Sequence, residues 1–576
     1  MVALENQRAA QIFTEIAEFL ELKGENPFKI RAYQRAARAF NGMDRSLAEL
    51  HASGELLSVP GVGKNIADKV AQLLDEGRVE LHERLAAEFP PQLLDLMDIP
   101  GLGPKKAATL YRELRISSVP ELEQALREGR IRALKGFGAR SETNLLEGIR
   151  RHKTADRRLP LGRARDLAAD LAERLTGVPG VERVVAAGSV RRWRETAGDL
   201  DLLCQVQGSP EGVIERFCGL VPGDQVSARG DTRCSLRLGD GFQVDLRIVP
   251  GESFGAALQY FTGSKDHNVA LRNRAEKLGY KLNEYGLFDR DGKSVAGETE
   301  EGVYQALGMP FIPPEIRETG QEIALALEGA LPDLIRPDQV QGNLHTHSTW
   351  SDGSDPLGGL AGEALRRGYE YLAVTDHSRS LAIANGLTPE RLLEQCREID
   401  ALNSGLEGLV LLKGTECDIL GDGSLDFPDE LLSQLDLVVA SVHSGFQMPA
   451  QEMTRRILRA IENPHVDILA HPTGRRLGRR PAYEADWEVI FQAAARTGTA
   501  LEVNGSPRRL DLSDSMARRA SQHGVRIAIG TDAHSLREFE HIQLGVGVAR
   551  RAWVTGVQVI NTWPLSQLKG WLEGRS

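Results

Sequence analysis

The sequence is poor in cysteine and contains no long hydrophobic run. Its five cysteines, at positions 204, 218, 234, 396 and 417, are widely spaced and form no CxxC pair. This usage indicates reduced thiols in a cytoplasm. No apolar stretch reaches the length of a membrane span, and the first residues have no signal-peptide architecture. We therefore expect a cytoplasmic protein without a membrane partner.

The sequence also lacks an overall basic charge. Its net charge of −11 would, by itself, argue against a nucleic-acid partner. The charge is unevenly spread, however. Residues 1–160 carry a net charge of +2, and the segment 101–160 within them carries +7. Residues 161–337 carry −6 and residues 338–576 carry −7. We therefore expect residues 1–160 to bind a polyanion, and the acidic remainder of the chain to supply carboxylates that bind metal ions. At 576 residues the chain is too long for one core, so three to five domains are expected.

Two segments in the first third repeat one pattern. Residues 59–69 and 99–108 each have a helix-like lead, a Gly-apolar-Gly turn and the start of an amphipathic helix, and 134–140 form a degenerate third copy. The glycines permit a tight turn in which N–H groups at a helix N-terminus can bind phosphate. This helix-hairpin-helix contact positions DNA without reading its sequence, although plain helix packing is the alternative. The expected DNA-binding residues are Gly61, Gly63, Lys64, Gly101, Gly103 and Lys105.

Three acidic residues are expected to meet in the middle of the chain. Residues 184–203 read as an apolar strand, a Gly-Ser pair, a basic turn and a second strand that begins Asp199-Leu-Asp201. Strand alternation places Asp199 and Asp201 on one face, and Asp245 lies on another apolar strand that can pair alongside. Three such carboxylates predict a two-magnesium site for in-line phosphoryl transfer. The expected contacts to the triphosphate are Gly188, Ser189 and Arg192.

Across about residues 1–320 the sequence resembles DNA polymerase family X, the group that contains DNA polymerase beta. The resemblance rests on the hairpins, the Gly-Ser element, the acid triad and the segment YFTGS at 260–264. It implies Mg²⁺-dependent synthesis from dNTPs on gapped or primer–template DNA. By this resemblance the sugar lies beside Tyr260, Phe261 and Gly263, the base edge at Asn268 and the templating base near Arg272.

Lys69 lies one or two helical turns beyond the first hairpin. Its amine could form a Schiff base with the aldehyde of an abasic sugar if nearby cations lower its pKa; the alternative is a phosphate contact. Lys69 falls on the lyase-lysine position of family X. The sequence departs from that family at Asn65, where the lyase helix carries a second lysine, and at Gln243, where eukaryotic enzymes carry arginine. These departures bear on lyase chemistry more than on polymerisation.

Metal-ligand residues recur through residues 338–576. Most lie at or just after apolar runs, at 371–377, 408–416, 435–443, 466–471 and 525–534. Such runs predict buried parallel strands, and side chains at the carboxyl ends of barrel strands converge on one face. Histidine and carboxylate together suit zinc, manganese or iron. The ligand-type residues are His345, His347, Asp352, Asp376, His377, Glu416, His443, His471, Asp532 and His534.

This pattern resembles the PHP (polymerase and histidinol phosphatase) family, a distorted barrel that holds up to three metals. The resemblance implies a phosphoesterase with Mn²⁺ or Zn²⁺. It assigns one ion to His345, His347, Glu416 and Asp532, a second to Asp352, His377 and His471, and a third to Glu416, His443 and His534. Arg475, Arg476, Arg479 and Arg480, just after His471, would hold the scissile strand.

The expected fold is multidomain: α-helical helix-hairpin-helix domains, an α/β nucleotidyltransferase palm with a thumb, and a C-terminal distorted (β/α)7-type PHP barrel. We expect a lyase-like domain at 1–85, fingers at 86–160, a palm at 161–255, a thumb at 256–320, a linker at 321–337 and the barrel at 338–576. The expected protein is a monomeric, nucleoid-associated DNA polymerase that fills short gaps in base excision or break repair. Its barrel would act as a 3′–5′ exonuclease and could incise abasic sites.

Three other functions were weighed against this one. A small-molecule phosphatase, such as a histidinol-phosphate phosphatase, leaves the first 337 residues without a role. A non-enzymatic DNA-end scaffold does not account for the complete acid triad and ligand series. A tRNA-type nucleotidyltransferase shares the Gly-Ser and Asp-x-Asp elements but explains neither the hairpins nor residues 260–263. Primer extension on gapped DNA distinguishes among them.

Overall fold

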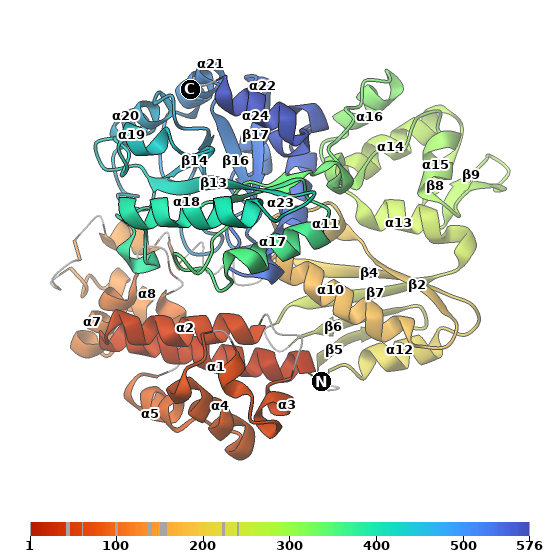
Figure 1. Cartoon of the computed structure of the whole chain (residues 1–576). Coiled ribbons are helices and arrows are strands. Elements are labelled where there is room, and N and C mark those ends of the chain that lie inside the picture. Colours follow the sequence, from red (N-terminus) through yellow and green to blue (C-terminus); the bar gives the residue numbers. More distant parts are fainter. Residues whose placement is uncertain are drawn as a thin grey trace.

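Figure 1 shows the computed structural model, in which a helical amino-terminal part, a palm, a thumb and a barrel follow one another along the chain. The structure describes residues 2–41, 46–59, 61–90, 92–97, 99, 102–132, 134, 137–138, 141–146, 148–149, 158–221, 225–238 and 241–574. Among the described residues, no helix is long and apolar enough to cross a membrane.

The amino-terminal part is entirely helical in its described residues. Its α-helices are α1 (Val2–Lys23), α2 (Pro27–Asn41), α3 (Leu47–Ala52), α4 (Lys64–Glu76), α5 (Glu80–Glu88), α6 (Gln92–Met97), α7 (Pro104–Leu114) and α8 (Val119–Arg127). They share one hydrophobic core, because the helices place apolar residues on one face; Phe13, Phe40 and Leu110 are among its buried members. The two hairpins therefore belong to one packed unit.

The palm is built on a five-stranded sheet in the order β2-β4-β7-β6-β5. Its elements are β1 (Leu159–Pro160), α10 (Leu161–Thr176), β2 (Val181–Ala186), α11 (Gly188–Arg191), β3 (Thr196–Ala197), β4 (Asp199–Val206), α12 (Glu211–Cys218), β5 (Val226–Arg229), β6 (Arg233–Arg237) and β7 (Gln243–Val249). In β4, Leu200 and Leu202 are buried, so Asp199 and Asp201, which alternate with them, point to the other face.

The thumb follows with helices around a three-stranded sheet in the order β10-β9-β8. Its elements are α13 (Phe254–Thr262), α14 (Lys265–Lys277), β8 (Lys281–Asn283), β9 (Gly286–Phe288), β10 (Ser294–Ala296), α15 (Glu300–Ala306) and α16 (Gln321–Leu327). Ile323 and Ala326 of α16 pack into the thumb core. The expected linker 321–337 thus begins with a helix that belongs to the thumb, since its apolar face is buried there. Similarly, the expected boundary at residue 85 falls inside α5.

The carboxy-terminal region is a seven-stranded parallel barrel with strands in chain order, β11 to β17. The strands are β11 (Gly342–Asn343), β12 (Tyr371–Val374), β13 (Val410–Asp418), β14 (Leu437–Ser441), β15 (Ile468–Leu469), β16 (Ala500–Asn504) and β17 (Ile527–Gly530). A parallel bridge between Thr346 and Ala533 brings the first and last segments together. The expected fold class is confirmed.

Helices cover the outside of this barrel (Figure 1). They are α17 (Leu357–Arg366), α18 (Pro389–Asn403), α19 (Asp429–Leu432), α20 (Ala450–Ile461), α21 (Trp487–Thr497), α22 (Asp514–Gln522), α23 (Ile542–Arg551) and α24 (Leu565–Glu573). The apolar runs correspond to five of the strands. No uninterrupted apolar run predicts β11, which has only two residues, or β16, in which Glu502 lies among apolar residues.

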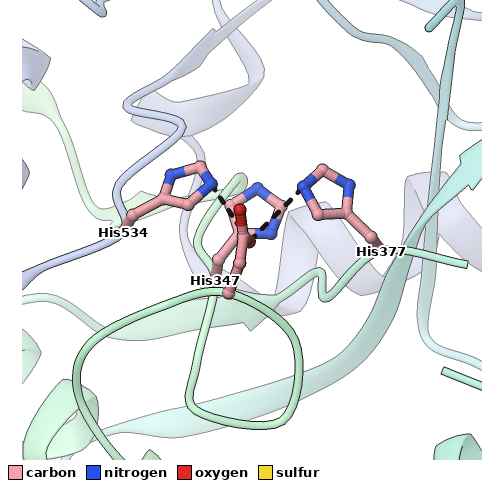
Figure 2. Close-up of side chains that lie close together, drawn as sticks. His347, His377 and His534 are labelled. Atoms are coloured by element: carbon pink, nitrogen blue, oxygen red, sulfur yellow. Dashed lines mark ion pairs between the residues drawn. The ribbon is translucent and has the colours of Figure 1, made fainter. Parts of the chain in front are cut away.

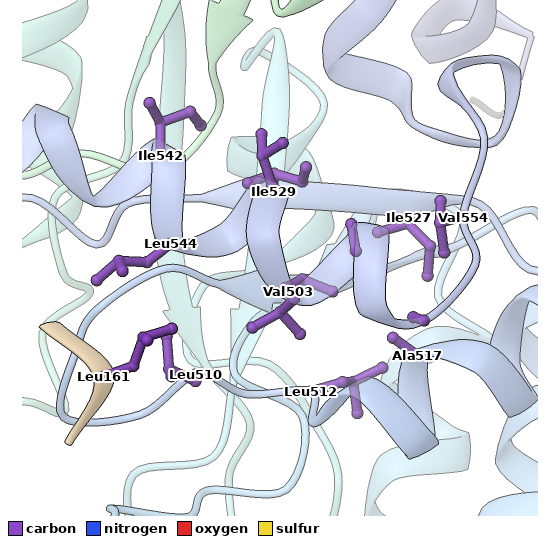
Figure 3. Packing of buried hydrophobic residues seen from close by; sticks show 14 of the residues in the cluster. Leu161, Val503, Leu510, Leu512, Ala517, Ile527, Ile529, Ile542, Leu544 and Val554 are labelled. Carbon is purple, nitrogen blue, oxygen red and sulfur yellow. The ribbon is translucent and has the colours of Figure 1, made fainter. Parts of the chain in front are cut away.

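The palm and the barrel share one hydrophobic core. Figure 3 shows Leu161, at the start of α10, beside Leu510 and Leu544 of the barrel, and all three belong to one buried cluster. A Cβ on Gly162 would come within 2.8 Å of Pro507, so the two parts approach with their backbones close together. The palm and the barrel therefore pack directly against each other.

Candidate active sites in the palm and the barrel

The barrel strands bring the metal-ligand residues together at their carboxyl ends. Glu416 lies on β13, and the histidines follow neighbouring strands. The Nε2 atom of His471 is 2.8 Å from Oε1 of Glu416, and that of His443 is 3.4 Å from the same oxygen. The Nε2 atom of His347 is 3.3 Å from Oδ1 of Asp532. These groups are all buried or nearly so, and such a set of donors is what a divalent ion requires.

The described part of the chain contains three groups of possible metal ligands, all in the barrel. Within each group, the ligand atoms lie within 4.8 Å of one another. They are His345, His347 and Asp532; His347, Asp352, His377 and His534; and His377, Glu416 and His443. Figure 2 shows His347, His377 and His534 close together, and the ring centroids of His347 and His534 are 4.3 Å apart.

This grouping corrects the assignment of two histidines to the second and third ions. The PHP resemblance assigns His471 to the same ion as Asp352, and His534 to the same ion as Glu416. In the structure, Nε2 of His534 is 3.2 Å from Asp352, and His471 instead contacts Glu416. The reason is the order of the strands. His534 follows β17, and a bridge joins that segment to the one after β11, which carries Asp352. His471 follows β15, which is separated by β14 from β13, the strand of Glu416.

The chemistry of these residues fits metal ions. Among the described residues, several buried atoms of the cluster make no hydrogen bond, and four of them are Nε2 of His345, Nε2 of His347, Oδ1 of Asp352 and Oε2 of Glu416. Buried polar atoms are costly without a partner, and a cation would satisfy all four. Burial, followed by the charges of His534 and His377, lowers the pKa of His347 to about 3, so this imidazole keeps a lone pair for a metal.

Residues around the cluster hold the ligands in place. Nδ1 of His345 is 2.7 Å from Glu502, and Nδ1 of His443 is 2.6 Å from Asp418. Such carboxylates orient a ligand imidazole and fix its tautomer. Neither was anticipated; the signal for each was an acid on a buried strand beside a ligand position. Asp376, counted among the ligand types, instead accepts hydrogen bonds from the backbone and hydroxyl of Ser348, at 2.9 and 2.6 Å.

Some of the arginines expected to hold a DNA strand contact other protein groups in the structure. Arg475 pairs with Glu195 of the palm at 2.8 Å and therefore joins two domains. Burial and neighbouring cations lower the pKa of Arg480 to about 10. Arg509, which was not anticipated, lies 3.3 Å from Asp532. Arg509 rather than Arg475 reaches the metal-ligand cluster, because the loop after β16 folds over it.

In the palm, the strand pairing brings the expected acids side by side. β4 and β7 are parallel, and Asp201 is the direct partner of Asp245. Burial, together with the charges of Asp199 and Asp245, raises the pKa of Asp201 to about 7. Gly188 has φ +58 and its Cβ would lie 2.3 Å from Oδ2 of Asp201, so only glycine fits this approach. Crowded carboxylates of this kind are stabilised by divalent cations.

The three palm acids are not gathered as closely as the barrel ligands, since they are absent from the groups within 4.8 Å. Asp199 is exposed at the start of β4. Asp245 accepts hydrogen bonds from Nε2 of Gln243, at 2.8 Å, and from Oγ of Ser235. Gln243, at which the sequence departs from the family pattern, is therefore a direct neighbour of Asp245. Nothing in the sequence around Ser235, on β6, predicts its contact with Asp245.

The residues expected to bind the nucleotide lie on or beside α11, α13 and α14. Oγ of Ser189 is buried and has no hydrogen-bond partner among the described residues. Nδ2 of Asn268 donates to the carbonyl of Tyr260 at 2.7 Å and so holds the end of α13. Phe261 packs edge-on against Tyr260, Gly263 has φ +67, and Arg272 is exposed on α14. Arg192 lies against Gly263, with its Nε 3.2 Å from Glu318.

Each hairpin turn leads into a helix that begins without a side-chain cap. Gly63 is the N-cap of α4, which starts at Lys64, and Gly103 is the N-cap of α7, whose second residue is Lys105. Gly61 has φ +79. An uncapped helix start beside lysine suits a phosphate. Gly101, Pro60, Pro100 and part of 134–140 lie outside the described residues.

Lys69 lies on α4, one face of which is buried. Its Nζ is 3.2 Å from the carbonyl of Asn65 and also bonds the side-chain oxygen of that residue. Burial, followed by the positive charges of Lys29 and Arg84, lowers its pKa despite the nearby Asp68. A lowered pKa favours a nucleophilic amine.

Known proteins resemble the chain as a whole and in parts. Residues 257–318 match the DNA polymerase beta thumb family, 4–79 the helix-hairpin-helix domain family and 93–151 the SAM-like helix-hairpin-helix tandem family. The DNA polymerase/3′-5′ exonuclease PolX of Bacillus subtilis (strain 168) is 40% identical over 566 residues, which cover 98% of each chain.

Two further similarities each cover a part of the chain. A probable phosphatase of Thermoanaerobacter sp. (strain X514) is 30% identical over 240 residues, covering 40% of this chain and 93% of that protein. The crystal structure of Leishmania infantum polymerase beta in a ternary P/T complex is 24% identical, covers 39% of this chain and 99% of that one, and gives a TM-score of 0.26.

Proposed function

The chain belongs to the family X DNA polymerases that combine DNA synthesis with a 3′–5′ exonuclease, and we propose that it fills short gaps during DNA repair and trims 3′ ends. The observation that carries the polymerase proposal is the pairing of Asp201 with Asp245 on β4 and β7, with Gly188 closing over Asp201. The acids would hold two Mg²⁺ ions, which when bound stabilise the attacking and leaving oxygens.

The remaining palm and thumb residues have binding roles in this proposal. Ser189, whose hydroxyl is buried without a partner, and the guanidinium of Arg192 would bind the triphosphate. Tyr260, Phe261 and Gly263 would bind the sugar, with Asn268 and Arg272 nearer the bases. Gln243 and Ser235 hold the Asp245 carboxylate in one orientation, so a substitution at either would alter nucleotide addition without removing an acid.

The barrel carries the exonuclease in this proposal. Three sets of ligand residues at one barrel face would hold Mn²⁺ or Zn²⁺, which when bound supply hydroxide near neutral pH. Arg509 and the neighbouring arginines would hold the scissile phosphate. Incision at abasic sites would use the same centre, because it is also phosphodiester hydrolysis. The separate test is cleavage of a duplex that contains one abasic site.

The proposal is tested by primer extension on a one-nucleotide gap. Purified protein with Mg²⁺ and dNTPs should fill the gap, and with Mn²⁺ but no dNTPs it should shorten the 3′ end. A small-molecule phosphatase would release phosphate from phosphate esters without either DNA reaction. A nucleotidyltransferase acting on tRNA would add nucleotides without a template. Either of those results, with no gap filling, contradicts the proposal.

We expect gapped DNA with a 5′ phosphate to be preferred over an open primer. The uncapped starts of α4 and α7 would contact the backbone on both sides of the gap, so binding should weaken steeply with salt. Affinity measured between about 50 and 200 mM salt should fall by about 10³-fold if some six phosphates are neutralised. Lys105→Ala is expected to make this slope shallower. Equal affinity for gaps with and without the 5′ phosphate would contradict the role of the hairpins.

Lys69→Ala is expected to abolish borohydride trapping of the chain on abasic-site DNA. The lowered pKa of Lys69 supports a Schiff-base role, while its bonds to Asn65 hold the amine and should keep wild-type trapping weak. DNA binding should change less than about threefold, because one phosphate contact is a small part of the total. Lys64→Ala, which removes an expected phosphate contact at the start of the same helix, should leave the trapping in place. Trapping that persists in the Lys69 variant would place the nucleophile elsewhere.

A further inference from the structure

The last residue of α23, Arg551, joins the barrel to the palm and the thumb. Its side chain is 4% exposed and is anchored within the barrel by Asp514 at 2.8 Å. It also donates to the backbone carbonyl of Arg192 at 2.6 Å and to the carboxylate of Glu318 at 2.9 Å. A barrel residue is therefore in direct contact with Arg192 of the palm and with Glu318 of the thumb.

Glu318 is shared among three arginines. Its Oε1 accepts from Arg551 at 2.9 Å and from Nε of Arg192 at 3.2 Å, and its Oε2 is 3.6 Å from Arg194. The Arg192 guanidinium also donates to the carbonyl of Thr262, next to Gly263. Arg192 is thus held between a carboxylate and the nucleotide-binding turn. How strongly Glu318 attracts it depends on how well the other cations neutralise Glu318.

Helix α23 also fixes the backbone that follows Arg192. Trp193 has φ +57, a backbone conformation that residues other than glycine rarely adopt. Packing around the Trp193 side chain must therefore stabilise this conformation. The indole lies directly on Gly547, where a Cβ would come 2.1 Å from the ring, and Arg165 covers the ring at 3.8 Å. Helix α23 of the barrel therefore contacts the backbone carbonyl of Arg192, its carboxylate partner Glu318 and the residue that follows it, Trp193.

We propose that Arg551 of the barrel is a positioning residue for polymerisation, because it neutralises Glu318 and so leaves the Arg192 guanidinium available to the triphosphate. This rests on the proposed role of Arg192 in nucleotide binding. Without Arg551, the Glu318 carboxylate would lose its closest cation. It would then hold Arg192 more strongly and add negative charge beside the triphosphate, which weakens nucleotide binding more than it slows the chemical step.

The test is steady-state insertion of one nucleotide into a one-nucleotide gap by the full chain. R551Q is expected to raise the KM for dNTP about tenfold, with kcat within about threefold of wild type. Adding E318Q should bring the KM back to within about threefold of wild type, because the uncompensated carboxylate is gone. Loss of packing alone would not be repaired by a second substitution. The Mn²⁺-dependent exonuclease should be unchanged, since it does not use Arg192.

Arg550 offers a matched control. It also links α23 to the other domains, through Glu315 at 2.7 Å and the carbonyl of Ile335 at 2.7 Å, and in the described structure no bond joins it to Arg192 or Glu318. R550Q is therefore expected to leave the KM for dNTP unchanged. Because Arg551 is nearly buried, R551K is a second variant that keeps the charge. The lysine ammonium would still neutralise Glu318, so the KM of R551K should rise less than that of R551Q.

Several results would overturn the inference. It fails if R550Q raises the KM as R551Q does, if R551K also shows the tenfold rise, or if E318Q brings no rescue; bracing by the barrel is then the explanation. It also fails if R551Q leaves the KM unchanged while R192Q raises it, although the nucleotide site stands in that case. If R192Q itself leaves the KM unchanged, the proposed triphosphate role of Arg192 is wrong and the inference falls with it.

Discussion

Replacing Asp199 and Asp201 with alanine is expected to abolish nucleotide addition. Asp201 pairs with Asp245 across β4 and β7, and burial, together with the charges of Asp199 and Asp245, raises its pKa to about 7. Removing two ligands should cost at least ~4 kcal/mol of transition-state stabilisation, which corresponds to a loss of about 10³-fold in kcat/KM. The measurement is insertion of one dNTP into a one-nucleotide gap with Mg²⁺.

The Mn²⁺-dependent exonuclease serves as the internal control for that variant, and it should remain within about twofold of wild type because its ligands lie in the barrel. Asp231→Ala, which removes an exposed palm acid at the turn before β6, is the matched surface control and should synthesise normally. Template-directed synthesis that persists in the double variant would show that other residues hold the catalytic ions.

The second large effect is expected in the barrel. Replacing His345 and His347 with alanine should empty one metal position and disturb the next, because His347 belongs to two of the three ligand groups. The 3′–5′ exonuclease should fall by about 10³-fold or more, and metal analysis should find fewer bound ions per chain. In the wild type, removing the ions with a chelator should abolish the exonuclease activity in the same way. Adding Mn²⁺ back should restore that activity.

Polymerisation gives the control for this second variant and should stay within about threefold of wild type, because its acids lie in the palm. His523→Ala, a barrel histidine that pairs with Glu488 away from the cluster, should leave both activities unchanged. An exonuclease that stays active with two histidines removed, in a protein that melts at the wild-type temperature, would mean that these ions are structural. It would contradict the catalytic role of the centre.

Local sequence spacing determined much of this protein. Asp199 and Asp201 share a face because they are two residues apart on a strand, and Gly63 and Gly103 start helices because a turn there needs no side chain. The apolar runs of the last third predicted five barrel strands, and the order of motifs identified both families. All of these properties depend on neighbours along the chain, so periodicity and residue type were sufficient to predict them.

Only the tertiary structure decided which distant groups meet. His534 joins Asp352 because the first and last barrel segments are bridged, whereas His471 joins Glu416. Glu502 proved to support His345, and Arg551 to contact Glu318 beside the nucleotide site. Sequence spacing carries no record of these pairs, because strand order, loop path and domain packing set the distances between residues far apart in the chain.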